Sequence, residues 1–340
     1  MNKNPIVRYV GIGTAGMLLS TAISAKAALL AYEPFDYSPG EPLIGQNGGM
    51  GFNSAWLYNS SGHSNNQIVV SGSFSYTDQY GNQLLTSGNR VHVTGDGTAE
   101  GDNTGGVRGS GQPLRVFGFY RGNSDVNETT WISLLALRTG LPLEYQYTPG
   151  SYLYYGRAAS FQLFWQGDTN NTGQGSERLS IGRASQNAEA TSLLPKDTWA
   201  ALNRGAAGQT VVSQVPLTNL PCVFLLVRID HVPGVNPGND TAYIWINPPS
   251  LVTEPDISTA NITISASQFA SNDRDYNFDR IRLFGGGWNS TVGYGSIQLD
   301  EIRIGTTFAD VTPLVPEPSV VVLSVLGGLG LLVWRLRRKQ

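Results

Sequence analysis

The chain has 340 residues, of which 22 are basic and 25 acidic, giving a formal net charge of −3. Only 14% of the residues are charged and 41 are glycine, which excludes a nucleic-acid-binding protein with a basic face and a coiled coil rich in Glu, Lys, Ala and Leu. Apolar residues make up 40% of the chain, enough for a core, and the single cysteine, Cys222, excludes an internal disulfide and a CxxC metal site.

The N-terminal segment has the three parts of a secretory signal peptide. Lys3 and Arg8 precede an apolar run from Val10 to Ile23, and Ala25-Lys26-Ala27 follows as a cleavage site of the A-x-A type. The run is about 14 residues long, whereas a helix that spans a bilayer needs ~20. We predict that residues 1–27 are a signal peptide cleaved after Ala27; a retained anchor helix is the alternative.

Residues 28–313 are predicted to form one all-β domain. Short alternating or apolar runs are separated by Gly, Asn, Asp and Pro clusters, and no long segment has helical periodicity. Many short strands without helices indicate a two-sheet antiparallel jelly-roll sandwich. The predicted strands are Gln67–Tyr76, Arg90–Thr94, Leu114–Tyr120, Thr130–Leu137, Ser160–Trp165, Arg178–Gly182, Thr210–Val215, Cys222–Asp230, Ala242–Asn247, Asn261–Ala266, Phe278–Phe284 and Ser296–Ile304.

Four segments of this domain give more specific predictions. Asp197–Asn203 is the best helical segment, with Asp197 as its N-cap. The continuously apolar run Val223–Val227 is typical of a middle strand. In Asp279–Phe284 we expect the apolar residues to face the core and the Arg residues to face out. In Leu299–Ile304 the isoleucines are expected to face in, with Asp300 where the strand begins.

One acidic run has the alternation of a calcium-binding loop. It contains Asp273, Asp275, Asn277 and Asp279, oxygen-bearing side chains that share one face if the backbone is extended. Phe278 stands where an EF-hand loop has glycine, and no Glu follows at the twelfth position. The alternatives are a calcium site and a solvated turn before a strand; no other cofactor is indicated.

Aromatic residues beside amides are candidates for sugar binding, because a ring stacks on a pyranose while amides bond its hydroxyls. The candidates are Trp288, which follows three glycines, its neighbour Asn289, and Tyr154. The alternative is that such aromatic residues fill the core or cover a sheet edge.

The C-terminal segment, residues 314–340, has three parts in order. Pro316-Glu317-Pro318 comes first, an uncharged apolar run from Ser319 to Trp334 follows, and Arg335, Arg337 and Arg338 form a basic cluster at the end. As a helix the run would be about 24 Å long, short for a hydrocarbon core of ~30 Å. The basic cluster places the C-terminus in the cytoplasm by the positive-inside rule.

This arrangement resembles the PEP-CTERM sorting signal. The resemblance implies recognition of Pro316, Glu317 and Pro318 by an exosortase-type membrane peptidase. It also implies a precursor held in the inner membrane by the C-terminal helix, and then delivery to the cell surface or extracellular matrix of a Gram-negative bacterium. A plain C-terminal membrane anchor is the alternative.

The charge of the body differs from that of the whole chain. Seven of the 22 basic residues lie in residues 1–27 and 319–340 and none of the 25 acidic residues does, so residues 28–318 have a net charge of −10. Such a body should stay soluble and repel anionic surfaces.

A second resemblance covers most of residues 28–313. Leu29–Tyr37 resembles the opening strand of concanavalin A-like (LamG-type) jelly rolls of bacterial surface proteins, and Leu299–Gly305 resembles the closing strand. The resemblance implies that these two strands are neighbours. Matching segments lie between them at Trp131–Leu135, Phe161–Phe164, Leu179–Gly182, Phe224–Asp230 and Phe278–Leu283.

Enzymes exist on this fold, but the sequence lacks their motifs. Related glucanases use a Glu-x-Asp-x-x-Glu or Glu-x-Asp-x-Glu run, which is absent, and no Gly-x-Ser-x-Gly elbow occurs. The histidines, His63, His92 and His231, lie in different segments without metal-ligand spacing. We therefore predict an exported, non-catalytic surface or matrix protein that binds polysaccharide. The alternatives are a secreted polysaccharide-degrading enzyme such as a glycoside hydrolase, and a purely structural matrix protein.

Overall fold

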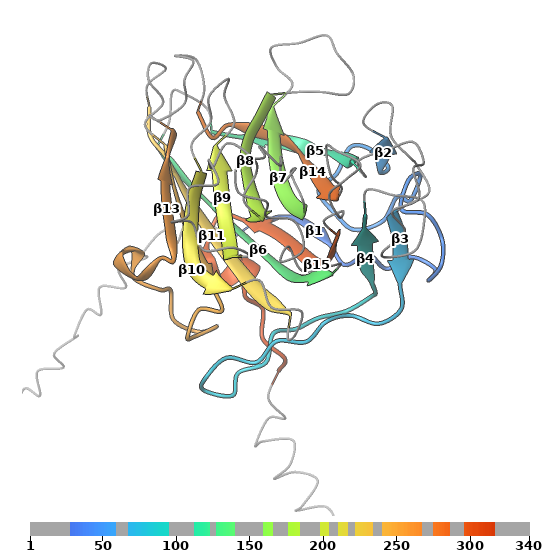
Figure 1. Ribbon diagram of the computed structural model, residues 1–340, viewed down its shortest axis with the longest axis horizontal. Helices are drawn as coiled ribbons and strands as arrows, with labels where there is room; N and C mark the ends of the chain where they lie inside the picture. The colour runs from blue at the N-terminus through green and yellow to red at the C-terminus, as the bar shows by residue number, and fades with distance from the viewer. Residues whose placement is uncertain are drawn as a thin grey trace, which may run out of the picture.

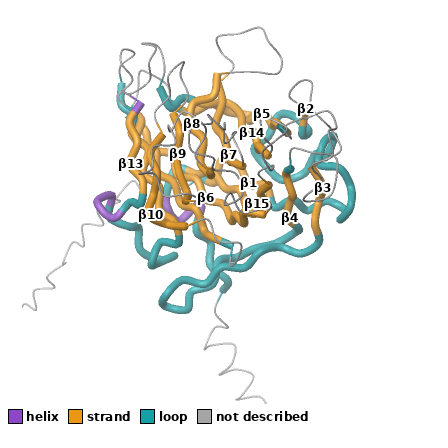
Figure 2. Tube along the Cα trace, viewed as in Figure 1, coloured by secondary structure: helices purple, strands orange, loops and turns teal. Residues whose placement is uncertain are grey.

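The computed structural model describes residues 28–58, 67–94, 112–122, 127–139, 159–165, 176–183, 198–203, 210–216, 222–233, 240–266, 275–285 and 296–316. Within them the chain forms two antiparallel sheets and very little helix (Figures 1 and 2), so the all-β, two-sheet part of the predicted fold class is confirmed. The predicted signal peptide, and the sorting segment beyond Pro316, lie outside the described residues.

The first sheet has eight strands. Their order is β13-β12-β11-β6-β15-β4-β3, and β1 pairs with β15 beside this path. The opening and closing strands of the domain are therefore neighbours, as the sequence predicted. The bounds are Leu29–Glu33 (β1), Gln67–Val70 (β3), Arg90–Val93 (β4), Glu128–Thr139 (β6), Val223–His231 (β11), Thr241–Ile246 (β12), Ile262–Ser265 (β13) and Ser296–Gly305 (β15).

The second sheet has seven strands in the order β10-β9-β8-β7-β14-β5-β2. The chain crosses between the sheets after β1, β2, β4, β5, β6, β10, β13 and β14, so sequence neighbours often lie in opposite layers, as in jelly rolls. The bounds are Leu57–Tyr58 (β2), Pro113–Arg121 (β5), Ala159–Trp165 (β7), Ser176–Arg183 (β8), Thr198–Asn203 (β9), Thr210–Pro216 (β10) and Phe278–Gly285 (β14). Two one-turn helices complete the described elements, the 3₁₀ helix η2 (Ile257–Thr259) and α1 (Phe308–Val311).

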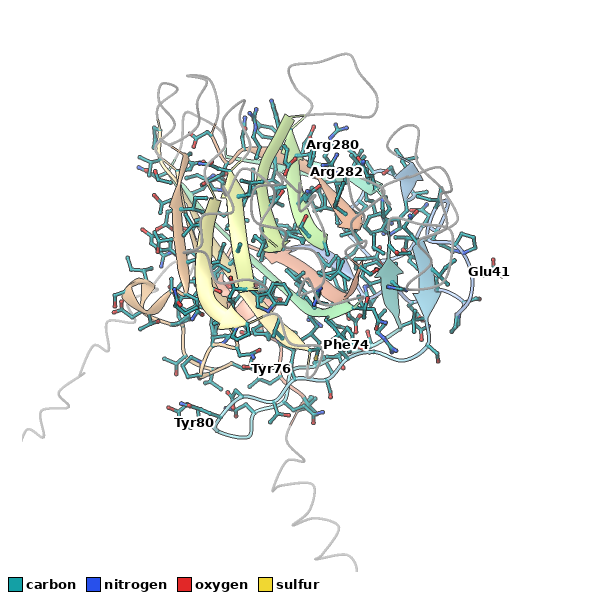
Figure 3. The ribbon with its side chains drawn as sticks, viewed as in Figure 1. Glu41, Phe74, Tyr76, Tyr80, Arg280 and Arg282 are labelled. Carbon is teal, nitrogen blue, oxygen red and sulfur yellow. The ribbon has the colours of Figure 1, made fainter. Side chains whose placement is uncertain are left out.

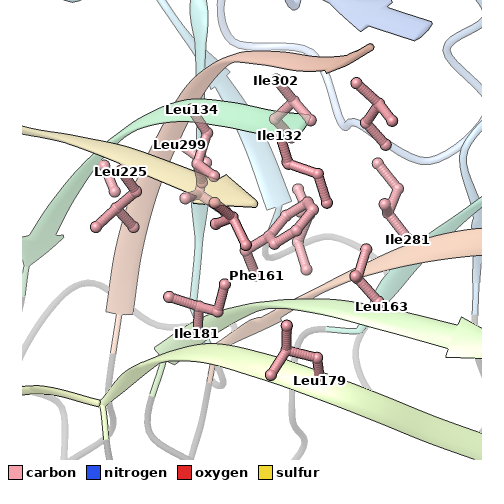
Figure 4. Close-up of a cluster of buried hydrophobic side chains, with 14 of the residues drawn as sticks. Ile132, Leu134, Phe161, Leu163, Leu179, Ile181, Leu225, Ile281, Leu299 and Ile302 are labelled. Carbon is pink, nitrogen blue, oxygen red and sulfur yellow. The ribbon is translucent and has the colours of Figure 1, made fainter. Parts of the chain in front are cut away.

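The main core lies between the two sheets. Alternate residues of each strand point inward, so that Ile132 and Leu134 of β6 face Phe161 and Leu163 of β7 across the interface (Figure 4). All four side chains are fully buried. The alternation predicted for β14 holds on this side, because Ile281 and Leu283 belong to the same core.

A second apolar cluster covers the outer face of the eight-stranded sheet. It contains Trp131 of β6, Phe224 of β11 and Trp245 of β12, on which α1 and two loops pack. The rings of Trp131 and Trp245 are stacked 6.0 Å apart, and Phe308 of α1 meets Trp131 edge-on at 5.6 Å. Strand β11 is therefore buried on both faces, which confirms the middle strand predicted from its continuous apolar run.

The prediction of a helix over 197–203 is wrong for the six described residues of this segment, because Thr198–Asn203 form strand β9. Alanine and leucine favour a helix in isolation, but here the segment pairs with β8 and β10 and buries all six residues. Trp199 and Ala201 point into the main core. Asp197, the predicted N-cap, lies outside the described residues.

The sequence predicted that strand β15 begins at Asp300. Asp300 instead lies at a β-bulge in the middle of this strand. The pairing with β6 shifts between Asp300 and Arg303, and Glu301 has a φ of 54°. Asp300 is fully buried and accepts hydrogen bonds from Ser73 Oγ (2.6 Å) and Phe74 N (2.7 Å). Burial, followed by repulsion from Glu301, raises the pKa of Asp300 to about 8, although these bonds oppose the shift. The bulge thus fixes the loop that follows β3, which explains why β3 ends at Val70 rather than at the predicted Tyr76.

A buried ion pair joins β1 of the eight-stranded sheet to β5 of the seven-stranded sheet. Glu33 of β1 accepts hydrogen bonds from Arg115 of β5, Tyr37 Oη (2.9 Å) and Trp56 Nε1 (3.0 Å). Arg115 also donates to the carbonyl of Gly48 at 2.5 Å. Removing either charge would leave the other unpaired in the interior, which is strongly unfavourable. The pair therefore fixes residues 33–56 against the edge of the sandwich.

Candidate functional site

The outer face of the seven-stranded sheet carries a group of polar side chains from three adjacent strands. Pairing aligns Arg282 of β14 with Gln162 of β7, and Gln162 with Ser180 of β8, in one row across three strands. The next row aligns Arg280, Phe164 and Glu177. Five of these side chains point away from the main core because residues next to them on their strands point into it. Glu177 lies where the pairing of β7 with β8 shifts, and its bonds to Gln162 and Ser180 place it on the same face.

Arg282 is the centre of this polar cluster, which consists of Gln162, Glu177, Ser180 and Arg282. Its Nε donates to Gln162 Oε1 at 2.5 Å, and its Nη2 lies 3.5 Å from Glu177 Oε2. Gln162 Nε2 and Ser180 Oγ both donate to the same oxygen of Glu177. The Arg282 guanidinium also lies over the ring of Phe164, 4.0 Å from its centroid.

The sequence prediction that the Arg residues of β14 face out is correct, and this outer face is itself buried. Arg280 is 6% exposed and Arg282 4% exposed, so both faces of β14 are buried. The charge of Arg282 is accommodated because its donors meet carboxylate and amide oxygens instead of water. Figure 3 shows the two arginines close together on the strand, at the opposite end of the view from Tyr80.

An exposed aromatic pair lies beside the polar cluster. Tyr120 of β5 is 54% exposed, and its ring centroid is 5.8 Å from that of half-buried Trp165 at the end of β7. Asp279 and Arg280, on β14 between these two strands, form a two-point ion pair with distances of 2.8 and 3.0 Å. The face therefore combines an accessible ring with hydrogen-bonding groups whose orientation is fixed.

A second polar chain lies in the described residues where β5, β6, β11 and β14 meet. Arg121 Nε donates to Thr130 Oγ1 at 2.9 Å, His231 Nε2 lies 2.9 Å from the same oxygen, and His231 Nδ1 lies 2.8 Å from Asp240 Oδ2. His231 therefore links the Thr130 hydroxyl to the Asp240 carboxylate through its two ring nitrogens. Burial, then the adjacent Asp240, raises the pKa of Asp275 to about 7.

This chain has the order hydroxyl, imidazole, carboxylate of a hydrolase triad, but it cannot act as one. Thr130 is fully buried and His231 is 2% exposed, so no substrate can reach the hydroxyl. The network instead satisfies polar groups at the edge of the sandwich. Gly122 is needed beside it, because it has a φ of 78° and a Cβ there would lie 3.0 Å from His231 Nδ1.

The predicted calcium ligands do not converge where they are described. Asp279 is paired with Arg280, and Asp275 Oδ1 accepts from the backbone N–H groups of Tyr276 (3.1 Å) and Asp240 (3.2 Å). Asn277 Oδ1 is buried without a hydrogen-bond partner, and Asp273 lies outside the described residues. Within the described ranges, no three His, Cys, Asp or Glu side chains are grouped so as to hold a metal ion. The calcium site stays a prediction.

The other predicted site residues fall largely outside the described ranges. This holds for the sugar-binding candidates Tyr154, Trp288 and Asn289, and for Glu317, Pro318, Arg335, Arg337 and Arg338 of the sorting signal. Pro316 is the last described residue and is exposed. None of the described helices has the length and apolar character that crossing a bilayer requires.

Sequence reasoning missed the polar cluster because no local pattern marks it. Gln162 and Glu177 are 15 positions apart, and Gln162 and Arg282 are 120 apart. Only the pairing of β8, β7 and β14 brings them together. The one sequence signal for these residues is that two successive strands each carry a polar residue at an outward position.

No protein-family model matches the chain, and no curated protein sequence does. Among solved structures the chain is similar to an endo-β-1,4-glucuronan lyase from the fungus Trichoderma reesei, with 14% identity over 84% of this chain and 99% of that one and a TM-score of 0.41. It is similar to an endo-1,3-β-glucanase from Streptomyces sioyaensis, with 12% identity, coverage of 83% and 96% and a TM-score of 0.36. It is also similar to the Emp46p carbohydrate recognition domain, with 9% identity, coverage of 70% and 88% and a TM-score of 0.34. With TM-scores this low, the fold assignment rests on the strand pairing described above, and the function is argued from the site.

Proposed function

We propose that the chain is an exported surface or matrix protein that binds polysaccharide on the outer face of its seven-stranded sheet. The observation that carries this proposal is the accessible Tyr120–Trp165 pair beside the polar cluster and the Asp279–Arg280 ion pair. A sugar ring offers an apolar C–H face and hydroxyl groups around its edge. The exposed tyrosine ring matches the first, and the Asp279 carboxylate, the more exposed member of the ion pair, matches the second.

Fixed geometry favours binding on this face. Asp279 is partly exposed and already held by Arg280, so little of its side-chain entropy remains to be lost when a glycan is bound. The buried Arg282, Gln162 and Glu177 support this arrangement from within the sheet. Extended strands also place the groups in rows, which suits a linear chain of sugars.

Polysaccharide cleavage is the second candidate function, and the buried Glu177 carboxylate beside Arg282 favours it. A retaining glycosidase needs two carboxyl groups ~5–5.5 Å apart, one of them available as an acid. Glu177 and Asp279 are each paired with an arginine, and Glu177 is buried, so neither is placed to donate a proton to a glycan. We therefore favour binding without cleavage.

The export part of the proposal rests on the two end segments. The last backbone bond of the described chain runs from Val315 N to Gln83 O at 2.9 Å, and Pro316 follows at an exposed position. The Pro-Glu-Pro motif therefore begins where the sandwich ends, which suits recognition by a membrane peptidase. Replacing Pro316, Glu317 and Pro318 by alanine should leave an unprocessed precursor in the inner membrane; unchanged surface delivery would contradict the sorting proposal.

A glycan array tests the binding proposal, with residues 28–316 as the probe because they contain every described element. We expect binding to a subset of polysaccharides, without release of reducing ends or unsaturated products from the bound ones. Cleavage of a bound glycan would favour the enzyme. If no polysaccharide binds with or without calcium, the structural matrix protein is favoured instead.

A further inference from the structure

The first described residue is held by the last helix. The backbone nitrogen of Ala28 lies 3.2 Å from Asp310 Oδ2 and 3.3 Å from Thr306 Oγ1. The carbonyl of Ala28 accepts from Thr306 N at 3.2 Å, so residue 28 is bound at both of its backbone groups. This contact closes β1 onto the end of β15.

Asp310 is held in place independently of Ala28. Its Oδ2 accepts from the backbone nitrogens of Thr306 (3.1 Å) and Thr307 (2.8 Å), the second bond being part of the capping box of α1. Gly305 lets α1 approach, because a Cβ at this position would lie 2.4 Å from Asp310 Cβ. Helix α1 is itself fixed by Phe308 on Trp131 and by Ser133 Oγ on the carbonyl of Val311.

Ala28 is also the residue that follows the predicted cleavage site. Hydrolysis of the Ala27–Ala28 peptide bond consumes one water; it leaves a carboxylate on Ala27 and an ammonium group on Ala28. Before cleavage the nitrogen has one proton for two acceptors, whereas an ammonium group has three protons and a positive charge. The charged group would arise beside a carboxylate that already points at it.

We infer that the Asp310 carboxylate is the binding site for the α-ammonium group that cleavage creates at Ala28. The inference rests on the proposed export, since it requires the mature chain to begin at this residue. Cleavage then replaces a shared neutral hydrogen bond by an ion pair, so that maturation strengthens the closure of β1 on β15.

The neighbouring charged groups on the packed strands do not compete for this position. Glu33 of β1 and Glu128 of β6 pair with arginines of β5, and the charged groups at the bulge of β15 bind one another or a loop. Asp310 is the ionisable side chain bonded to Ala28 among the described residues. The pairs are Glu33 with Arg115, Glu128 with Arg121, Arg303 with Glu301, and Asp300 with the Ser73–Phe74 loop.

The pH dependence has a definite sign. An unpaired α-amino group has a pKa of about 7.7–8.0, and the nearby carboxylate raises it in the folded protein. The ion pair therefore contributes its full stability below about pH 7.7 and loses it as the pH rises through the raised value.

The test compares two forms of residues 28–340 in detergent micelles, one with a free Ala28 amino group and one acetylated there. Acetylation keeps a single N–H, as in the precursor, and removes only the charge. At pH 6.5 we expect the free form to unfold about 2 °C higher. This difference should vanish at pH 10.5 and in Asp310→Asn, but persist in the exposed control Asp36→Asn.

Two results would overturn the inference: equal melting temperatures of the two forms at pH 6.5, or the same difference in Asp310→Asn as in the unchanged protein. The intact mass of the exported protein tests the export step separately. A chain that begins elsewhere than Ala28 refutes the cleavage position and the inference with it. A chain that begins at Ala28 but lacks the Asp310-dependent difference refutes the role of Asp310 alone.

Discussion

The outer faces of the two sheets are built from different chemistry. On the eight-stranded sheet, Trp131, Trp245 and Phe224 form an apolar surface that the chain covers with its own α1 and loops. On the seven-stranded sheet, the same layer position holds Arg280, Arg282, Gln162, Glu177 and Ser180. Apolar surface is best used by burying it against the same chain, whereas fixed polar groups beside an exposed ring suit a polar ligand. In our proposal, one face serves stability and the other serves binding.

The largest effect should come from the apolar face. Trp245→Ala removes the ring stacked on Trp131 and the Nε1 bond to Thr259 Oγ1, so we expect a loss of about 4 kcal/mol in the free energy of unfolding. Urea unfolding of residues 28–316 measures it. Glycan affinity of the folded fraction should stay unchanged; a specific loss of affinity would break the division between the faces.

The Asp300 carboxylate at the bulge of the eight-stranded sheet should contribute to the pH dependence of stability. Burial raises the pKa of Asp300 from 3.8 to about 8, so between these values the folded chain binds more protons than the unfolded chain. Stability therefore falls as the pH rises through this window, by an amount on the order of 3 kcal/mol. Asp300→Asn should flatten the slope, whereas Asp36→Asn should not. An unchanged slope in Asp300→Asn would show that the bulge carboxylate is not the titrating group.

The polar cluster should contribute less stability. Arg282→Met leaves Glu177 buried without its arginine, though Gln162 and Ser180 still donate to it, and we expect a loss of about 2 kcal/mol. Adding Glu177→Leu should recover most of this loss without restoring glycan binding. If the double variant binds glycan as well as the unchanged protein, the cluster is purely structural.

The smallest stability effect should come from the exposed ring. Tyr120 is 54% exposed, so Tyr120→Ala should change the free energy of unfolding by less than about 0.5 kcal/mol. A larger change in thermal or urea unfolding would mean that the ring serves packing and not binding.

Strands with clear alternation or continuous apolar character were predictable from the sequence. The inward residues of β14 and the two-sided burial of β11 follow directly from residue order. Strand β9 was not predictable, because Thr198–Asn203 favour a helix locally. Only the pairing with strands on both sides makes this segment a strand. The bulge at Asp300 and Glu301 has no local signal either, since it depends on the pairing register with β6.

The candidate site was harder to predict than the fold. Its residues come from β5, β7, β8 and β14, and their outward positions gain meaning only when the strand order is known. His231 illustrates the same point, because its partners Thr130 and Asp240 come from other segments of the chain. Trp165 likewise has no local signal, because its contact with exposed Tyr120 depends on β14 lying between β5 and β7.

The most direct test of the central claim is the affinity of residues 28–316 for a polysaccharide identified on the array. Tyr120→Ala should weaken binding roughly ten-fold, since aromatic contacts contribute up to about 1.5 kcal/mol. Tyr80→Ala, which removes a 70% exposed ring at the opposite end of the molecule in Figure 3, should leave it unchanged. Equal affinities of the two variants would contradict the assignment of binding to the seven-stranded sheet.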